Sequence, residues 1–108
     1  MGRYLVLWRL NTAIIPYDDS AKYEKIMMQL SSMVENNLEK GMLKDWGMFI
    51  DSEYGYSIHE TDGETLMKNF IMFEPYIQIL EVHEALTVKK AMKSLREALK
   101  IKSEMFQP

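Results

Sequence analysis

The order in which two hydrophobic periodicities alternate along the chain is its most constraining feature. Apolar residues that alternate every second position predict strands, and apolar residues that recur every three to four positions predict helices. The predicted elements, in chain order, are a strand at 4–11, a helix at 20–40, strands at 43–51 and 54–60, a helix at 64–72, a strand at 76–83 and a helix at 88–103. This β-α-β-β-α-β order with one extra C-terminal helix predicts an α+β, ferredoxin-like fold.

The ferredoxin-like plan also predicts how the strands are ordered in space. Its four-stranded sheet is antiparallel, with the order fourth, first, third, second, so the first and third strands are central. A chain of 108 residues with 47% hydrophobic residues can bury one core. The sequence therefore predicts a single domain over residues 1–108.

The first strand is apolar on both faces. Val6 and Trp8 lie on one face, and Leu5 and Leu7 lie on the other, because successive side chains of a strand alternate sides. Two crossover helices can cover only one face of the sheet. A second copy of the chain is therefore expected to cover the other, which predicts a homodimer through the sheet face.

Charge and composition exclude several classes of function. The net charge is −3, with 13 Lys and Arg interleaved with 16 acidic residues, so no basic surface favours nucleic-acid binding. The chain has no cysteine, which excludes disulfides and thiolate metal sites. No apolar run approaches the length of a membrane span. The sequence predicts a cytoplasmic protein that requires no cofactor and has neither a nucleic-acid nor a membrane partner.

Residues typical of helix ends mark where the helices start and stop. Asp18, Asp19 or Ser20 can cap the first helix, and Gly41 can end it. The tetrad 61–64 matches a capping box for the second helix, and Thr87 can cap the third.

The topology predicts which polar residues meet at the sheet edges. His59 and His83 end the two strands that flank the first strand, so we expect them at the same edge, and on the same face if the alternation of side chains allows it. The opposite edge collects Arg9, Tyr56 and Tyr76.

Four short segments resemble one known superfamily. These are Lys44-Asp45-Trp46-Gly47, Gly55-Tyr56-Ser57-Ile58, Pro75-Tyr76 and Glu81-Val82-His83. Together with the first strand, they look like small, uncharacterised members of the dimeric α/β-barrel superfamily, and like proteins similar to muconolactone isomerase or of the YCII type. The resemblance implies a homodimer whose sheets pack face to face and leave clefts for small organic molecules. The YCII-type His–Asp pair does not transfer, because Glu84 follows His83.

His59, His83 and Glu81 are the candidates for catalysis. A histidine titrates near neutral pH and could move a proton on a bound enol or lactone, and burial would raise the pKa of Glu81. The alternative is that all three are rim residues bonded to backbone or water. The two histidines could share a metal ion only with help from a carboxylate, so we predict no metal site.

Arg9, Trp8, Tyr56 and Tyr76 are the candidates for ligand binding. A guanidinium among Leu5 and Leu7 must either pair with a carboxylate or face a wet cleft. A structural ion pair with Asp51 or Glu81 is the simpler explanation, and an anionic ligand is the alternative. The rings of Trp8, Tyr56 and Tyr76 could pack against such a ligand or simply fill the core.

The sequence therefore predicts a homodimer that binds a small anionic or aromatic molecule in a barrel cleft. Such a protein could also transfer a proton on the bound molecule, as an isomerase does. The alternative is a non-catalytic structural or interaction module whose cleft is filled by side chains. The residues leave open whether the protein is an enzyme.

Overall fold

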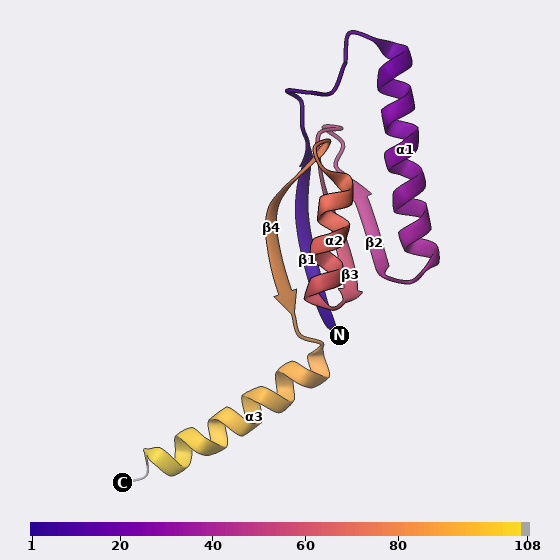
Figure 1. Cartoon of the computed structure of the whole chain (residues 1–108). Helices are drawn as coiled ribbons and strands as arrows, with labels where there is room; N and C mark the ends of the chain where they lie inside the picture. Colours follow the sequence, from indigo (N-terminus) through magenta and orange to yellow (C-terminus); the bar gives the residue numbers. More distant parts are fainter. Residues whose placement is uncertain (107–108) are drawn as a thin grey trace.

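The computed structural model describes residues 1–106 and has the predicted order of elements. Its elements are β1 (Gly2–Leu10), α1 (Ser20–Glu39), β2 (Leu43–Met48), β3 (Tyr54–Thr61), α2 (Gly63–Phe73), β4 (Ile77–Ala85) and α3 (Val88–Met105). Helices α1 and α2 lie on one face of the sheet, with α1 beside β2 and α2 over the central strands, whereas α3 runs away from the sheet (Figure 1). This is an α+β fold compatible with the ferredoxin-like plan.

The sheet has the strand order β2-β3-β1-β4, and every neighbouring pair is antiparallel. The predicted order is therefore confirmed. The hairpin between β2 and β3 is confirmed as well, and Asp51 shapes its connection by accepting hydrogen bonds from the backbone N–H groups of Glu53 and Tyr54. Strand β2 ends at Met48 rather than at the predicted residue 51, because Phe49 and Ile50 belong to this connection.

A β-bulge at Leu80 reverses the faces of β4. Leu7 pairs with Glu81 and Trp8 pairs with Ile79, so Leu80 is left between them without a partner in β1. An extra residue shifts the alternation by one position. Glu81 and His83 therefore lie on the face opposite Ile79, which simple alternation along the sequence does not predict.

Side-chain caps explain where the helices begin. Asp19, Asp62 and Thr87 each accept a hydrogen bond from a backbone N–H group three residues further on. The caps expected for the first and third helices are confirmed, whereas the second helix is capped by Asp62 and not by Thr61. Gly41 has a φ of 76° just past α1, the left-handed conformation that glycine adopts without strain.

The core lies between the sheet and the two helices that cover it. Its buried cluster consists of Trp8, Leu10 and Ile15. Half-buried side chains of α1, β2, β4 and the segment just before β4 surround this cluster. They are Tyr23, Met27, Trp46, Tyr76, Ile77 and Ile79. Within residues 1–106, no helix is both long enough and apolar enough to cross a lipid bilayer.

Candidate functional site

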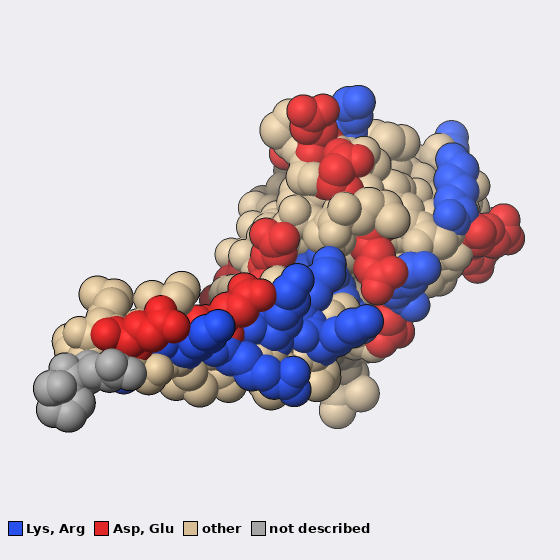
Figure 2. Space-filling view, turned by 90° about the horizontal axis from the view of Figure 1, so that it is seen from below, with Lys and Arg blue, Asp and Glu red and all other residues tan. Residues whose placement is uncertain are grey.

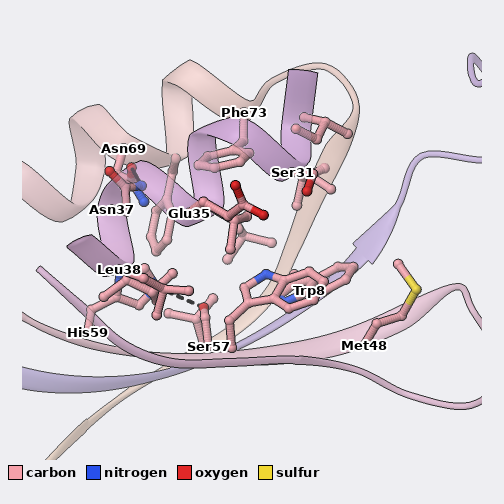
Figure 3. A pocket seen from close by; sticks show the side chains of 18 of the residues that line it. Trp8, Ser31, Glu35, Asn37, Leu38, Met48, Ser57, His59, Asn69 and Phe73 are labelled. Carbon is pink, nitrogen blue, oxygen red and sulfur yellow. Dashed lines mark hydrogen bonds between the residues drawn. The ribbon is translucent and has the colours of Figure 1, made fainter. Parts of the chain in front are cut away.

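A cavity of about 380 Å³ separates the helices from the sheet. Figure 3 shows the strands as its floor, with Trp8, Ser57 and His59 projecting from them, and the helices as its roof, with Glu35, Asn37 and Asn69. Apolar side chains form most of the lining: Val6, Leu10, Met27, Leu30, Val34, Leu38, Leu43, Met48, Phe70, Phe73, Ile77 and Ile79. The cavity exists because α1 packs against β2 but not closely against the central strands.

Two stacked tryptophans make up one part of the floor. The rings of Trp8 and Trp46 lie 5.4 Å apart between centroids and 20° from parallel. Gly55 is the β3 residue opposite Trp8, and a side chain there would overlap the indole of Trp8. The missing side chain at Gly55 therefore lets Trp8 lie across β3 and reach Trp46 on β2.

A serine and a histidine on β3 form the polar part of the floor. Ser57 Oγ lies 2.8 Å from His59 Nε2, and both residues are buried. They are two positions apart on one strand, so their side chains project from the same face. Burial lowers the pKa of His59 from 6.5 to about 4, because removal from water disfavours the charged imidazolium. His59 is therefore neutral at physiological pH.

Two buried nitrogen atoms in the floor lack a hydrogen-bond partner among the described residues: Trp8 Nε1 and His59 Nδ1. The indole N–H can only donate. His59 Nδ1 donates when the Ser57 hydroxyl donates to Nε2, and accepts when Nε2 donates to Ser57. Buried polar atoms are normally paired, so these two unpaired atoms are unusual features of the cavity floor.

A buried amide pair joins the two roof helices. Asn37 Nδ2 of α1 donates a hydrogen bond of 2.8 Å to Asn69 Oδ1 of α2. Both side chains are buried, and Phe70 beside Asn69 packs its ring edge-on to His59, at 6.3 Å between centroids. The pair fixes the spacing of α1 and α2 above the histidine.

Charge in the cavity is confined to one side chain. Among the described residues that line it, Glu35 is the one acidic residue; it lies on the roof side and is exposed. The lining includes no lysine or arginine. An anionic group would therefore enter without a compensating charge, whereas a neutral molecule would meet an apolar surface with a few polar atoms.

Arg9, predicted to bind a ligand, lies on the open face of the sheet, away from the cavity. Its guanidinium forms an ion pair of 2.6 Å with Glu53 and lies 5.1 Å from the ring centroid of Tyr54. Of the two explanations considered for Arg9, a structural ion pair and an anionic ligand, the structure contains the ion pair. The predicted partners, Asp51 and Glu81, are wrong, because Asp51 is bonded to the hairpin backbone and Glu81 pairs elsewhere.

Of the three aromatic residues predicted to contact a ligand, only Trp8 lines the cavity. Tyr56 lies on the open face, where its hydroxyl donates a hydrogen bond of 2.9 Å to Asp45, and this bond raises its pKa. Tyr76 is half-buried against the core cluster of Trp8, Leu10 and Ile15.

The structure does not bring the two histidines together. His59 pairs with Tyr4 and faces the helices, whereas His83 pairs with Leu5 and faces away from them. The bulge at Leu80 is the cause, since His83 would share the face of His59 without it. His83 and Glu81 instead form an exposed pair with 3.6 Å between Nε2 and Oε2. Among residues 1–106, no three His, Asp or Glu side chains are grouped closely enough to hold a metal ion.

Five polar residues of the cavity were not predicted from the sequence: Ser31, Glu35, Asn37, Ser57 and Asn69. The sequence does contain a pattern that predicts the burial of the two asparagines. Asn37 follows Met33 and Val34 at helical spacing, and Asn69 stands between Leu66 and Phe70 in an otherwise apolar stripe. A polar residue in such a stripe is buried with the stripe and therefore requires a partner.

The lowered pKa of His59 predicts a loss of stability in mild acid. Below pH 6.5 the unfolded chain binds a proton at His59, while the folded chain does so only near pH 4. The free energy of unfolding should therefore be fully present above pH 6.5 and should fall as the pH drops towards 4. Between pH 7.5 and 5.0 we expect a loss of about 1 to 2 kcal/mol, allowing for screening by water in the cavity.

Urea unfolding at these two pH values measures the loss, and His59→Gln is the control because it removes the titrating group. The variant should lose less stability between the two pH values than the wild type. Equal pH dependence of the two proteins would show that His59 is not the group responsible.

Comparison with known proteins adds no relative from which a function could be transferred. A scan against protein-family models finds no match, and a search of curated proteins finds no significantly similar sequence. A function for this chain is therefore inferred from its own structure, an α+β domain with an apolar cavity over a neutral serine–histidine pair.

Proposed function

We propose that the protein is a homodimer in which each subunit binds a small, neutral, largely aromatic organic molecule in the cavity between the sheet and helices α1 and α2. The observation that supports this most directly is an apolar cavity of about 380 Å³ with two unpaired polar nitrogen atoms, Trp8 Nε1 and His59 Nδ1, in its floor. Ligand sites of proteins are typically apolar cavities of about 300–1,000 Å³ with a few polar groups that fix orientation.

The charges around the cavity favour a neutral ligand. The carboxylate of Glu35 lies at the cavity, and Arg9, which was expected to orient an anion, is paired with Glu53 on the other face. Burying an unpaired carboxylate is costly. The ligand that fits has an aromatic body packed on Trp8 and a hydroxyl or carbonyl group that reaches the indole N–H or His59.

Binding is favoured over proton transfer as the role of the site. A general base works best when its pKa is near the working pH, and the pKa of His59 is about 4. His59 would therefore orient the ligand through a hydrogen bond, and isomerase-like chemistry would require the ligand itself to raise this pKa. The competing function is a structural or interaction module whose cavity holds no ligand.

The homodimer is proposed from the open face of the sheet. Leu5 is 36% exposed there, and Leu7 and Ile58 are half-buried beside it. The charges around these side chains are already paired, as Arg9 with Glu53 and Arg3 with Glu60. An apolar centre with a polar rim is the usual anatomy of a protein interface, and a second sheet packed face to face would give the dimeric α/β barrel.

Calorimetric titration with two matched probes tests the ligand proposal. 2-Naphthol and 2-naphthoate share an aromatic body, but only the second is an anion at pH 7. We expect 2-naphthol to bind at least about 10-fold more tightly than 2-naphthoate. Tighter binding of 2-naphthoate would contradict the proposed ligand class.

Val34→Phe locates the binding site. Val34 lines the cavity from α1, and a phenyl ring in place of its smaller side chain should weaken 2-naphthol binding by about 10-fold or more through overlap with the ligand. Met28→Phe is the matched control, since Met28 lies on the same helix, is exposed and does not line this cavity. Failure of all neutral aromatic probes to bind would favour the structural module.

A further inference from the structure

Helix α3 carries an apolar stripe against which no other described helix or strand packs. The stripe consists of Val88, Ala91, Met92, Leu95, Ala98 and Leu99. None of the residues of α3 is buried, and Figure 1 shows no other element beside the helix. An amphipathic helix gains most of its stability from packing its apolar face, so this stripe requires a surface that one copy of the chain does not supply.

The surface area of the chain indicates how large that contact is. A compact monomer of 12.7 kDa exposes about 6,200 Å², whereas this chain exposes 8010 Å². Its radius of gyration is 19.0 Å, against about 13 Å for a compact chain of this length. The excess is about 1,800 Å² per chain, or about 3,600 Å² for two chains, which lies in the range of about 2,000–5,000 Å² that obligate dimers bury in total.

The charges of α3 and of the remaining chain are opposite. Helix α3 contains six Lys and Arg against two Glu, a formal charge of +4, and the rest of the chain contains seven basic and fourteen acidic residues, a formal charge of −7. Figure 2 shows basic side chains gathered along α3, and acidic side chains interspersed with basic ones on the domain beyond it. This complementarity favours a second copy of the same chain as the partner of α3.

The connection to β4 keeps α3 away from its own sheet. Ala85 still pairs with Arg3 of β1, and Thr87 already caps α3. Only Leu86 lies between the last paired residue and the cap. Folding α3 back onto the open face of its own sheet would require the loss of the strand pairing or of the cap.

We infer that α3 is an exchanged arm that packs its apolar stripe against the acidic domain, residues 1–85, of a second copy, while the partner's α3 does the same in return. The inference rests on the proposed homodimer and identifies α3 as the element that holds the two chains together. Exchange buries both stripes, brings the basic arm to acidic carboxylates and accounts for the excess surface of the isolated chain.

Two substitutions in α3 of the full-length protein test the arm. Leu99 and Ile101 are similarly exposed, at 54% and 58%, but two residues advance about 200° around a helix, so only Leu99 lies on the stripe. In sedimentation analysis, Leu99→Glu should weaken dimerisation by about 30-fold or more. Ile101→Glu, the matched control, should change it by less than about threefold.

Zero-length carbodiimide crosslinking of a mixture of ¹⁴N- and ¹⁵N-labelled protein gives a second readout without a substitution. Bonds between lysines of α3 and carboxylates of residues 1–85 should join peptides of unlike isotope, which shows that they connect different chains. Crosslinks within one chain only would overturn the arm, as would equal dimerisation of the Leu99 and Ile101 variants. A wild-type protein that stays monomeric would overturn the homodimer itself, whereas a dimer unaffected by Leu99→Glu would overturn the arm alone.

Discussion

Gly55→Ala should lower the free energy of unfolding by about 3 kcal/mol or more, the largest effect we expect of any single methyl group in this chain. A Cβ atom at Gly55 would overlap both the indole of Trp8 and the backbone carbonyl oxygen of Gly47 on the neighbouring strand. Trp8 is 4% exposed and is stacked on Trp46, so lifting its indole towards the cavity would break this stacking. Relief requires β2 and β3 to separate, which breaks their hydrogen bonds.

Gly47→Ala is the matched control for this prediction. A Cβ atom at Gly47 would overlap the ring of Tyr56, but this ring lies on the open face and can swing away with the loss of one hydrogen bond to Asp45. We expect a cost below about 1.5 kcal/mol. Urea unfolding measures both values, and near-ultraviolet circular dichroism reports on the tryptophan pair. Equal stability of the two variants would show that Trp8 does not depend on the missing side chain at Gly55.

The architecture was predictable because its signals are local. Alternating and helical periodicities identified each strand and helix, and the β-α-β-β-α-β order then predicted the strand order that the sheet has. The caps at Asp19 and Thr87 are also local, since they bind backbone groups three residues away. Errors are confined to element ends such as Met48, where a strand gives way to a connection without a change in hydrophobicity.

The site was less predictable because it depends on long-range geometry. The bulge at Leu80 comes from the pairing of β4 with β1 and has no glycine or proline to mark it. It moves His83 and Glu81 to the open face, which separates them from His59. The cavity itself arises from the position of α1 above the sheet, a distance that the spacing of apolar residues along one helix does not encode.

The two proposed roles of the sheet fall on its opposite faces. The helix-facing side carries Trp8, Ser57 and His59 beneath the cavity, and the open side carries Leu5 and Leu7 for the proposed second copy. The proposed ligand and the proposed second copy would therefore not compete for the same surface. This separation also predicts that variants of the roof affect stability and ligand binding without altering dimerisation.

Asn37→Leu should lower the free energy of unfolding by about 2 to 3 kcal/mol, because it leaves the amide of Asn69 buried without its partner. Asn69→Leu should cost a similar amount for the reciprocal reason. The double variant removes both amides and leaves neither unpaired, so its cost should fall about 1 to 2 kcal/mol below the sum of the two single costs. Urea unfolding of the wild type, the two single variants and the double variant measures the four free energies of this double-mutant cycle. Strict additivity would mean that the hydrogen bond between α1 and α2 contributes nothing to holding the roof above His59, and that packing alone sets the height of the cavity.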